Sequence, residues 1–356
     1  MVDDMKVIFI VPSMAGGGAE RVVSVLANTF TEKQIQSKIM MTAGCECAYP
    51  LNPEIELLQA GGQTGKSITK RFKRIFTMRK LFRANRDAVL VAFEPDAAFF
   101  AGIAKIGLGM KLVASERNDP RSFGNKVTRR IAYEIADFLV FQTQDAKEYF
   151  PGHLQKKSQI IANPVKDDLP DIYEGERSKT VVSVGRLEEQ KNHRLLLQSF
   201  AEFYQNHPDY SLHIYGKGML EDELKKITTE LGIEDKVIFE GFCKDVLTKI
   251  RKSGMYVLSS DYEGISNSLL EAMAIGMPVI STDCPCGGTR MLIEDNVNGL
   301  LVPVRDQKKL AEAMTYMADH EELAGKMGRK AGEVRERFSV AYIADQWISA
   351  LNKILK

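Results

Sequence analysis

Short apolar runs alternate with longer amphipathic stretches along almost the whole chain. The runs are continuously apolar, which is typical of strands that are buried on both faces of a parallel sheet. Helix-length stretches such as 20–33 and 95–106 lie between them. The strand candidates are KVIFIV, SKIMMTA, IELLQA, AVLVAF, KLVAS, FLVFQT, QIIANP, TVVSVG, SLHIYG, KVIFEGF, MYVLSS, PVIST and GLLVP. This rhythm predicts an α/β protein with two Rossmann-like, doubly wound domains.

The rhythm weakens at 163–179, a charged segment with two prolines, and we expect the domain linker there. The predicted organisation is an N-terminal Rossmann-like domain, 1–165, and a C-terminal Rossmann-like domain, 166–336. The last residues, 337–356, are expected to form a helix that packs back on the first domain, because 319–356 contains no strand candidate. Two such domains in tandem predict an active site in the interdomain cleft, at the C-terminal ends of both sheets.

Composition narrows the class of protein. The chain has 356 residues, 44% of them hydrophobic, and a formal net charge of +1, so it is not a polycation suited to nucleic acid. No export signal and no membrane-spanning run is visible, and the five cysteines have no framework spacing, so we expect a protein of the cytoplasm. The pairs Cys45/Cys47 and Cys284/Cys286 are too closely spaced for a zinc site, and we predict no bound metal.

A glycine triplet, Gly16, Gly17 and Gly18, follows the first strand candidate and precedes the first helix candidate. Glycines at this position let a backbone approach a ligand closely, and helix N–H groups attract anions. The alternative is a plain tight turn, and Glu20 adds negative charge where a phosphate would lie.

Two cations, Arg186 and Lys191, follow the first strand of the second half. The planar guanidinium and the ammonium together suit phosphate oxygens. The alternative is a pair of solvated cations balanced by Glu188 and Glu189.

Two carboxylates, Glu263 and Glu271, lie eight residues apart in YEGISNSLLEAMAIGMPVIST. The pattern predicts that Glu263 lies in a loop before a helix and Glu271 in the second turn of that helix. Ser268 and Glu271 also fit a capping box, which would give Glu271 a structural role only. That alternative does not explain Glu263 or Gly264. A bound sugar nucleotide would explain all of them, because its hydroxyls need carboxylate acceptors and its phosphates need helix N–H groups.

With these motifs, the sequence resembles glycosyltransferase family 4, the retaining enzymes of the GT-B fold. The resemblance covers essentially the whole chain and rests on the glycine triplet, GRLEEQKN, YEGISNSLLEAMAIGMPVIST and NGLLVP. GGAERVV and SERNDP look most like bacterial enzymes that extend lipid-linked or surface glycans.

The resemblance implies that the domain at 1–165 binds the acceptor and that the domain at 166–336 binds the nucleotide sugar. It also implies roles for the motif residues. Arg186 and Lys191 would stabilise the departing nucleoside diphosphate, Glu263 would hold hydroxyls of the donor sugar, and Glu271 would bind the ribose hydroxyls. The residues expected to bind sugar, phosphate and base beside them are Gly264, Ile265, Ser266, Asn267, Phe242 and Cys243. No cofactor is expected, because the cations and the helix N-terminus would take the place of a metal.

One position departs from the family. Many relatives carry a histidine after the strand that corresponds to KLVAS, whereas this chain has Arg117 there. An arginine stays protonated and cannot act as a general base, but it could hold a phosphate or the acceptor. The candidates for a base at this position are therefore Glu116 and Asp119.

A rival motif, AGGQTGKS at 60–67, matches a relaxed P-loop in which Lys66 would bind phosphate. It lacks the first glycine and would leave the second half of the chain without a role. A P-loop NTPase is therefore an alternative, as is a GT-B sugar-nucleotide epimerase.

A basic stretch, 66–86, contains no acid, and its apolar residues approximate helical spacing. Such a helix suits the anionic inner face of the cytoplasmic membrane. The alternative is a helix that packs Phe72, Ile75 and Phe82 into the first domain with its cations solvated.

We therefore predict a metal-independent, retaining glycosyltransferase of cell-surface polysaccharide or glycoconjugate biosynthesis. It would move a hexose or N-acetylhexosamine from a nucleotide sugar, with UDP as the expected nucleotide. The expected acceptor is a glycan or a polyprenyl-diphosphate-linked glycan, and no nucleic-acid partner is expected.

Overall fold

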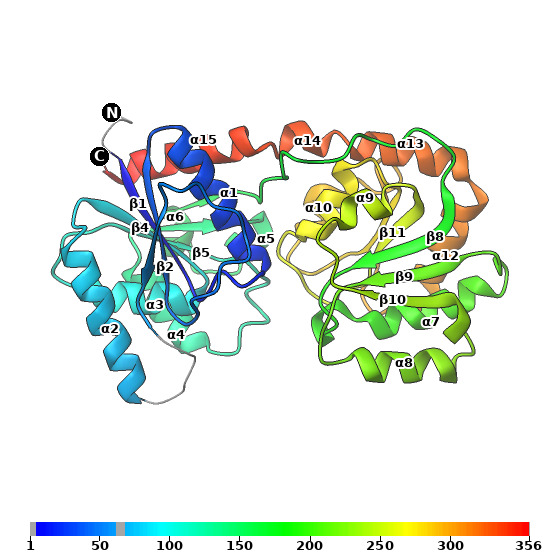
Figure 1. Ribbon diagram of the computed structural model, residues 1–356, viewed down its shortest axis with the longest axis horizontal. Coiled ribbons are helices and arrows are strands. Elements are labelled where there is room, and N and C mark those ends of the chain that lie inside the picture. Colours follow the sequence, from blue (N-terminus) through cyan, green and yellow to red (C-terminus); the bar gives the residue numbers. More distant parts are fainter. Residues whose placement is uncertain (1–4, 62–67, 356) are drawn as a thin grey trace. The chain divides into compact units, whose positions relative to one another are not determined.

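The chain forms two compact units. The computed structural model describes residues 5–61 and 68–355. The first unit runs to Pro164 and includes the chain from Val340 onward, and the second unit is Val165–Ser339. Each unit contains one parallel sheet with helices around it (Figure 1).

The sheet of the first unit has the strand order β3-β2-β1-β4-β5-β6-β7, and all neighbouring strands are parallel. The order reverses between β1 and β4, as in a doubly wound fold. The strands are β1 (Lys6–Val11), β2 (Gln36–Met41), β3 (Glu56–Gln59), β4 (Ala88–Phe93), β5 (Leu112–Ser115), β6 (Phe138–Phe141) and β7 (Ser158–Ile160). The helices are α1 (Gly18–Glu32), α2 (Ile68–Arg83), α3 (Pro95–Ala104), α4 (Lys126–Ile135), α5 (Gln144–Glu148), α6 (Gly152–Lys156) and α15 (Val340–Leu355).

The sheet of the second unit has the order β10-β9-β8-β11-β12-β13, again with parallel neighbours, and reverses between β8 and β11. The strands are β8 (Ser178–Val184), β9 (Ser211–Tyr215), β10 (Val237–Gly241), β11 (Ser253–Leu258), β12 (Val279–Thr282) and β13 (Leu300–Val302). The α-helices are α7 (His193–Tyr204), α8 (Glu221–Glu230), α9 (Val246–Ile250), α10 (Asn267–Ala274), α11 (Gly288–Leu292), α12 (Gln307–Asp319), α13 (Glu321–Ala331) and α14 (Val334–Arg337). Two 3-10 turns, η1 (Glu189–Lys191) and η2 (Glu234–Lys236), complete it.

The sequence pattern explains these sheets. Every predicted strand run becomes a strand, and the predicted helices 20–33 and 95–106 become α1 and α3. Strand β4 is buried along its whole length, because helices cover both faces of a parallel sheet. The tail from residue 319 folds as consecutive helices, as its pattern predicts.

An aromatic chain runs through the core of the first unit. Phe9 on β1 contacts Phe30 on α1 at 5.6 Å between ring centroids and Phe93 on β4 at 6.3 Å. Phe93 in turn stacks on Trp347 of α15, with centroids 5.6 Å apart. Helix α15, at the end of the chain, therefore belongs to the core of the first unit, where it packs beside α1 (Figure 1).

Candidate active site

The carboxyl ends of β8 and β11 meet where the strand order of the second sheet reverses. Ligands of doubly wound sheets bind in the crevice at this switch point. The segments that follow these two strands carry Arg186 and Lys191 on one side and Glu263 on the other. Arg186, Lys191 and Glu263 therefore lie at the position that the topology favours.

Glycines hold the loop after β8 against the loop after β9. A Cβ atom on Gly216, whose φ is +144°, would lie 1.8 Å from the carbonyl oxygen of Gly185. A Cβ on Gly218 would lie 2.2 Å from the carbonyl oxygen of Leu187. The two backbones can pack this closely only because neither position has a side chain.

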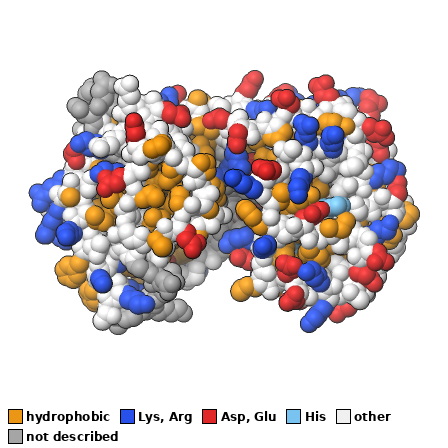
Figure 2. Space-filling view, viewed as in Figure 1, with side chains coloured by type: hydrophobic (Ala, Val, Ile, Leu, Met, Phe, Trp, Pro, Cys, Tyr) orange, Lys and Arg blue, Asp and Glu red, His pale blue; other side chains and the backbone are white. Residues whose placement is uncertain are grey.

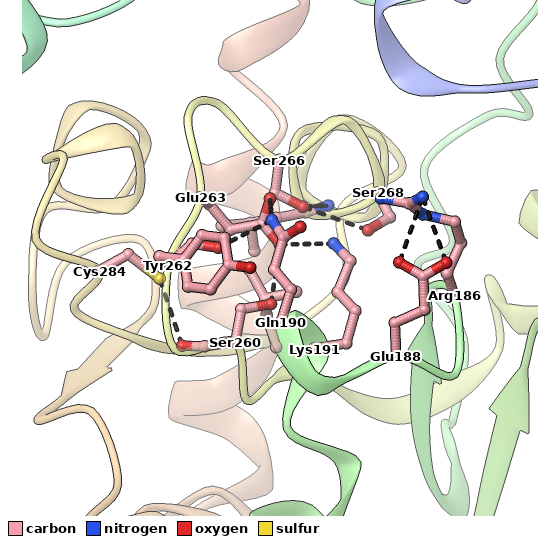
Figure 3. A network of polar contacts seen from close by, with 12 residues as sticks. Arg186, Glu188, Gln190, Lys191, Ser260, Tyr262, Glu263, Ser266, Ser268 and Cys284 are labelled. Carbon is pink, nitrogen blue, oxygen red and sulfur yellow. Dashed lines mark hydrogen bonds and ion pairs between the residues drawn. The ribbon is translucent and has the colours of Figure 1, made fainter. Parts of the chain in front are cut away.

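Lys191 and Glu263 form an ion pair, with Lys191 Nζ 2.5 Å from Glu263 Oε1 (Figure 3). Their side chains are only 15% and 9% exposed. Ser260 Oγ donates to the same carboxylate oxygen at 2.8 Å, and Gln190 Nε2 donates to Oε2 at 3.3 Å. The carboxylate is thus fixed by three donors, one of which is charged.

Arg186 lies outside this buried network. Its side chain is 66% exposed and pairs with Glu188 at 3.2 Å (Figure 3). An exposed pair of this kind contributes little to stability, so the guanidinium can exchange Glu188 for another anion at small cost.

Helix α10 starts at the end of the loop that carries Glu263. Ser266 is its N-cap, and its side chain accepts a hydrogen bond from the Leu269 N–H. The alternative of a capping box with Ser268 is wrong, because Ser268 lies inside the helix and Tyr256 Oη donates to its Oγ at 2.9 Å. The preceding turn is close-packed, since a Cβ on Gly288 would lie 1.7 Å from the carbonyl oxygen of Gly264.

Glu271 lies in the second turn of α10, as the pattern predicts, and is 8% exposed. Lys166 Nζ lies 3.9 Å from its Oε1 atom. Burial raises the pKa of Tyr256, and the charges of Glu263 and Glu271 raise it further. The two carboxylates therefore lie around one buried tyrosine.

The two residues expected beside a nucleotide base follow β10. Phe242 is 75% exposed and Cys243 is partly buried. The strand ends at Gly241, whose carbonyl accepts a hydrogen bond from the Gly216 N–H at 2.8 Å. This contact attaches them to the same glycine loop that packs on Gly185.

In the first unit, the glycine triplet precedes α1, and Gly17 is the N-cap. A Cβ on Gly17 would lie 2.1 Å from a carboxylate oxygen of Glu20. The Glu20 carboxylate thus lies at the N-terminus of the helix, where an anionic ligand of Gly16 to Gly18 would be expected.

Arg117 follows β5 at the carboxyl edge of the first sheet. Its guanidinium donates to Ser115 Oγ at 3.2 Å and to Asn163 Oδ1, and it lies 5.0 Å above the ring centroid of Phe93. Burial lowers the pKa of Arg117 to about 9, so the group remains a cation at neutral pH.

The two acids beside Arg117 are engaged within the protein. Glu116 is buried, accepts a hydrogen bond from Tyr133 Oη at 2.9 Å, and lies 3.9 Å from Arg129. Burial raises its pKa to about 7. Asp119 accepts hydrogen bonds from the backbone and side chain of Arg121.

Three further expectations concern the P-loop alternative, the basic stretch and a metal site. Lys66 of the P-loop alternative lies outside the described residues. In the basic stretch, Phe82 is buried but Phe72 is 58% exposed, so the alternative that packs Phe72 into the first domain is wrong for that residue. Among residues 5–61 and 68–355, no three His, Cys, Asp or Glu side chains form a group that could hold a metal ion.

Four residues of the site were not predicted from the sequence: Gln190, Ser260 and the paired glycines Gly216 and Gly218. The signal for the glycines was present, because a Gly-x-Gly directly after a parallel strand marks a close backbone approach. Gln190 and Ser260 carry no such signal, since their role depends on the carboxylate that they contact.

The chain is similar in sequence and in fold to known proteins. Residues 166–334 match the family "Glycosyl transferases group 1". A Campylobacter jejuni protein, named as an α-1,4-N-acetyl-D-galactosaminyltransferase acting on a GalNAc-GalNAc-diNAcBac-PP-undecaprenol glycan, is 28% identical, over 98% of this chain and 99% of its own. A second transferase of that organism, an N-acetylgalactosamine-N,N'-diacetylbacillosaminyl-diphospho-undecaprenol 4-alpha-N-acetylgalactosaminyltransferase, is 28% identical over 93% of this chain and 95% of its own.

Among solved structures, Anabaena HepE in complex with UDP has the same fold. The TM-score is 0.82 and the identity 19%, over 98% of this chain and all of the HepE chain. The two parallel sheets and this structural similarity show that the chain has the GT-B fold. With the family match over 166–334 and these relatives, the chain is a glycosyltransferase of the GT-B fold, similar to family 4.

Proposed function

We propose that this protein transfers a hexose or N-acetylhexosamine from a UDP-sugar to a glycan that is linked to a polyprenyl diphosphate. The two Campylobacter relatives are named for transfer of GalNAc to such glycans, and they align with nearly the whole chain. HepE was solved with UDP bound, which supports a uridine nucleotide as the donor. These similarities favour the transferase over the epimerase and the P-loop NTPase.

The observation that carries the proposal is the buried Lys191–Glu263 pair with the exposed Arg186 beside it on the same loop. Two cations at the switch point suit a diphosphate, and a fixed carboxylate suits sugar hydroxyls. A P-loop enzyme or a plain binding module would have no use for this combination.

Each residue has a defined task in the reaction. The acceptor hydroxyl oxygen forms a bond to the anomeric carbon, while the bond from that carbon to the diphosphate oxygen breaks. The proton of the acceptor leaves on the diphosphate, and Arg186 and Lys191 stabilise the charge that develops there. The front-face path, with retention of configuration, follows from the resemblance to family 4.

The remaining predicted residues bind the donor. Glu263 holds hydroxyls of the sugar, backbone N–H groups of 264–267 bind sugar and phosphate, and Glu271 accepts from the ribose. Phe242 and Cys243 flank the base, and the high exposure of Phe242 leaves its ring available to stack.

The first experiment separates the function classes. Calorimetry with UDP, GDP and ATP is followed by transfer assays with UDP-sugars and an undecaprenyl-diphosphate-linked glycan. We expect UDP binding and a product one sugar longer. Binding of ATP alone, abolished by Lys66→Ala, overturns the proposal.

We further propose that α2 attaches the protein peripherally to an anionic cytoplasmic membrane. Phe72 and Phe76, one helical turn apart, are 58% and 69% exposed, and exposed cations lie next to them in the sequence. Basic and apolar side chains gather on the face of the first unit where α2 lies (Figures 1 and 2). In the described part of the chain, no helix combines the length and apolar character that spanning a membrane requires.

A further inference from the structure

The ring of Phe93 lies between helix α15 and Arg117, the residue predicted to hold a phosphate or the acceptor. Phe93, the last residue of β4, stacks on Trp347 with centroids 5.6 Å apart and an interplanar angle of 24°. The Arg117 guanidinium carbon lies 5.0 Å from the centroid of the same ring. Phe93 therefore contacts both the indole of α15 and the cation at the sheet edge.

The backbone around Phe93 is fixed as well. The N–H of Glu94 donates to the carbonyl oxygen of Ser115 at 3.1 Å, and Glu94 has a φ of +79°. A non-glycine residue rarely adopts this conformation unless its surroundings impose it. The ends of β4 and β5 are thus held together at the point where Phe93 and Arg117 meet.

The guanidinium is oriented by neutral groups. Ser115 Oγ and Asn163 Oδ1 accept its hydrogen bonds, and Gln142 Nε2 donates to the same oxygen of Asn163 at 2.6 Å. The adjacent Glu116 carboxylate, which accepts from Tyr133 Oη and lies 3.9 Å from Arg129, is the acid whose charge acts on Arg117. A partly buried cation whose hydrogen bonds go to neutral groups, held in one orientation, is suited to bind an anionic ligand.

The contacts of Trp347 are made by its ring and not by its N–H group. It is fully buried, and its Nε1 atom has no hydrogen-bond partner. Buried indoles normally find a partner for this group, so an aliphatic side chain would suit a simple core position better. What an aliphatic side chain would lose is the flat contact with Phe93.

We propose that Trp347 is a positioning residue, which through Phe93 holds Arg117 in the orientation that binds the diphosphate of the acceptor. This inference rests on the proposed function. The planar fork of the guanidinium can take two phosphate oxygens at once, and the stack removes the side-chain freedom that would otherwise be lost on binding.

The test compares two acceptors, one with the lipid-linked diphosphate and one with the same glycan as a diphosphate-free glycoside. Trp347→Leu should raise the KM for the diphosphate acceptor about tenfold, which is the effect of losing one modest interaction. The KM values for the donor and for the glycoside should stay within about twofold. Trp347→Phe keeps a ring and should restore the wild-type KM.

Two further variants separate positioning from folding. Leu351→Ala removes an equally buried side chain one turn along α15 and should lower the Tm without changing any KM. Arg117→Gln should raise the KM for the diphosphate acceptor, and Trp347→Leu added to it should have no further effect.

The outcomes are distinct. Absence of transfer by the wild-type enzyme overturns the proposed function. Transfer with an unchanged acceptor KM in Trp347→Leu, equal rises for donor and acceptor, or additive effects with Arg117→Gln overturn the positioning role alone.

Discussion

Lys191 and Glu263 lie 72 residues apart in the sequence, yet their charged atoms are 2.5 Å apart. The pair forms because β8 and β11 are neighbours in the sheet, so the loops after them face each other. The candidate active site is organised around this ion pair.

Replacing Lys191 by Met should destabilise the protein. The variant leaves the Glu263 carboxylate buried without its counter-ion, at a cost of about 3–5 kcal/mol. Urea denaturation monitored by circular dichroism measures the free energy of unfolding. Adding Glu263→Gln should recover part of this loss, because a neutral amide needs no cation. A double variant as unstable as Lys191→Met alone would contradict the role given to the pair.

Arg186→Ala should impair transfer and leave stability nearly unchanged. The side chain is 66% exposed, but the leaving diphosphate loses a charge partner, so we expect turnover to fall by about 10²–10³-fold. Arg194→Ala is the matched control, since Arg194 is also an exposed cation paired with a glutamate. Equal turnover in the two variants would remove Arg186 from the site.

Glu271→Gln should weaken binding of UDP about tenfold, because the amide is a poorer acceptor for ribose hydroxyls than the carboxylate. Calorimetry measures the affinity, and Glu294→Gln controls for loss of one exposed carboxylate. Glu271 is not part of a capping box at Ser268, so a purely helical role is not expected to mask the result. Unchanged UDP affinity would exclude Glu271 from the nucleotide site.

Glu116→Gln should change the pH dependence of stability. Burial raises the pKa of Glu116 from 4.5 to about 7, so between these values the folded chain holds a proton that the unfolded chain has released. Wild-type stability relative to the variant should therefore fall as pH rises from about 4.5 to about 7, by on the order of 3 kcal/mol. Denaturation at pH 5 and pH 8 measures the difference. A difference that is the same at both pH values would mean that Glu116 is ionised throughout.

Neutralising the exposed cations of α2 should release the protein from anionic vesicles. The variant carries Gln at Lys70, Arg71, Lys73 and Lys80, each of which contributes on the order of 1 kcal/mol near the lipid. Arg74 is left intact, because its guanidinium lies 4.7 Å from the Phe100 ring centroid. Sedimentation with anionic and neutral vesicles, at low and high salt, measures binding.

The control for that experiment changes the same charge elsewhere, at Lys308, Lys309, Lys326 and Lys330 of the second unit. Only the α2 variant should lose binding. Equal binding to anionic and neutral vesicles, or unchanged binding in both variants, would mean that α2 is a solvated helix that does not contact the membrane.

Periodicity predicted strands and helices well, because burial on both faces of a parallel sheet leaves continuous apolar runs. It predicted that Glu263 precedes a helix and that Glu271 lies within it. It could not predict the contact of Glu263 with Lys191, since that depends on which strands are neighbours.

The basic helix shows a second limit. Phe72 and Phe82 are both apolar at apparently helical spacing, yet only Phe82 is buried. At 3.6 residues per turn, ten residues bring the second side chain roughly 80° away from the first around the axis. Phe76, four residues on, stays close to Phe72 and is exposed with it.

The first unit contains segments from both ends of the chain, so it cannot complete its core until the last helix has been synthesised. Its core includes Trp347, so its last helix is synthesised only after all of Val165–Ser339. At about 5–20 residues per second, the first 164 residues wait on the order of ten seconds or more for the segment that completes their core. During that interval the apolar surface that packs against α15 in the folded protein stays exposed to solvent.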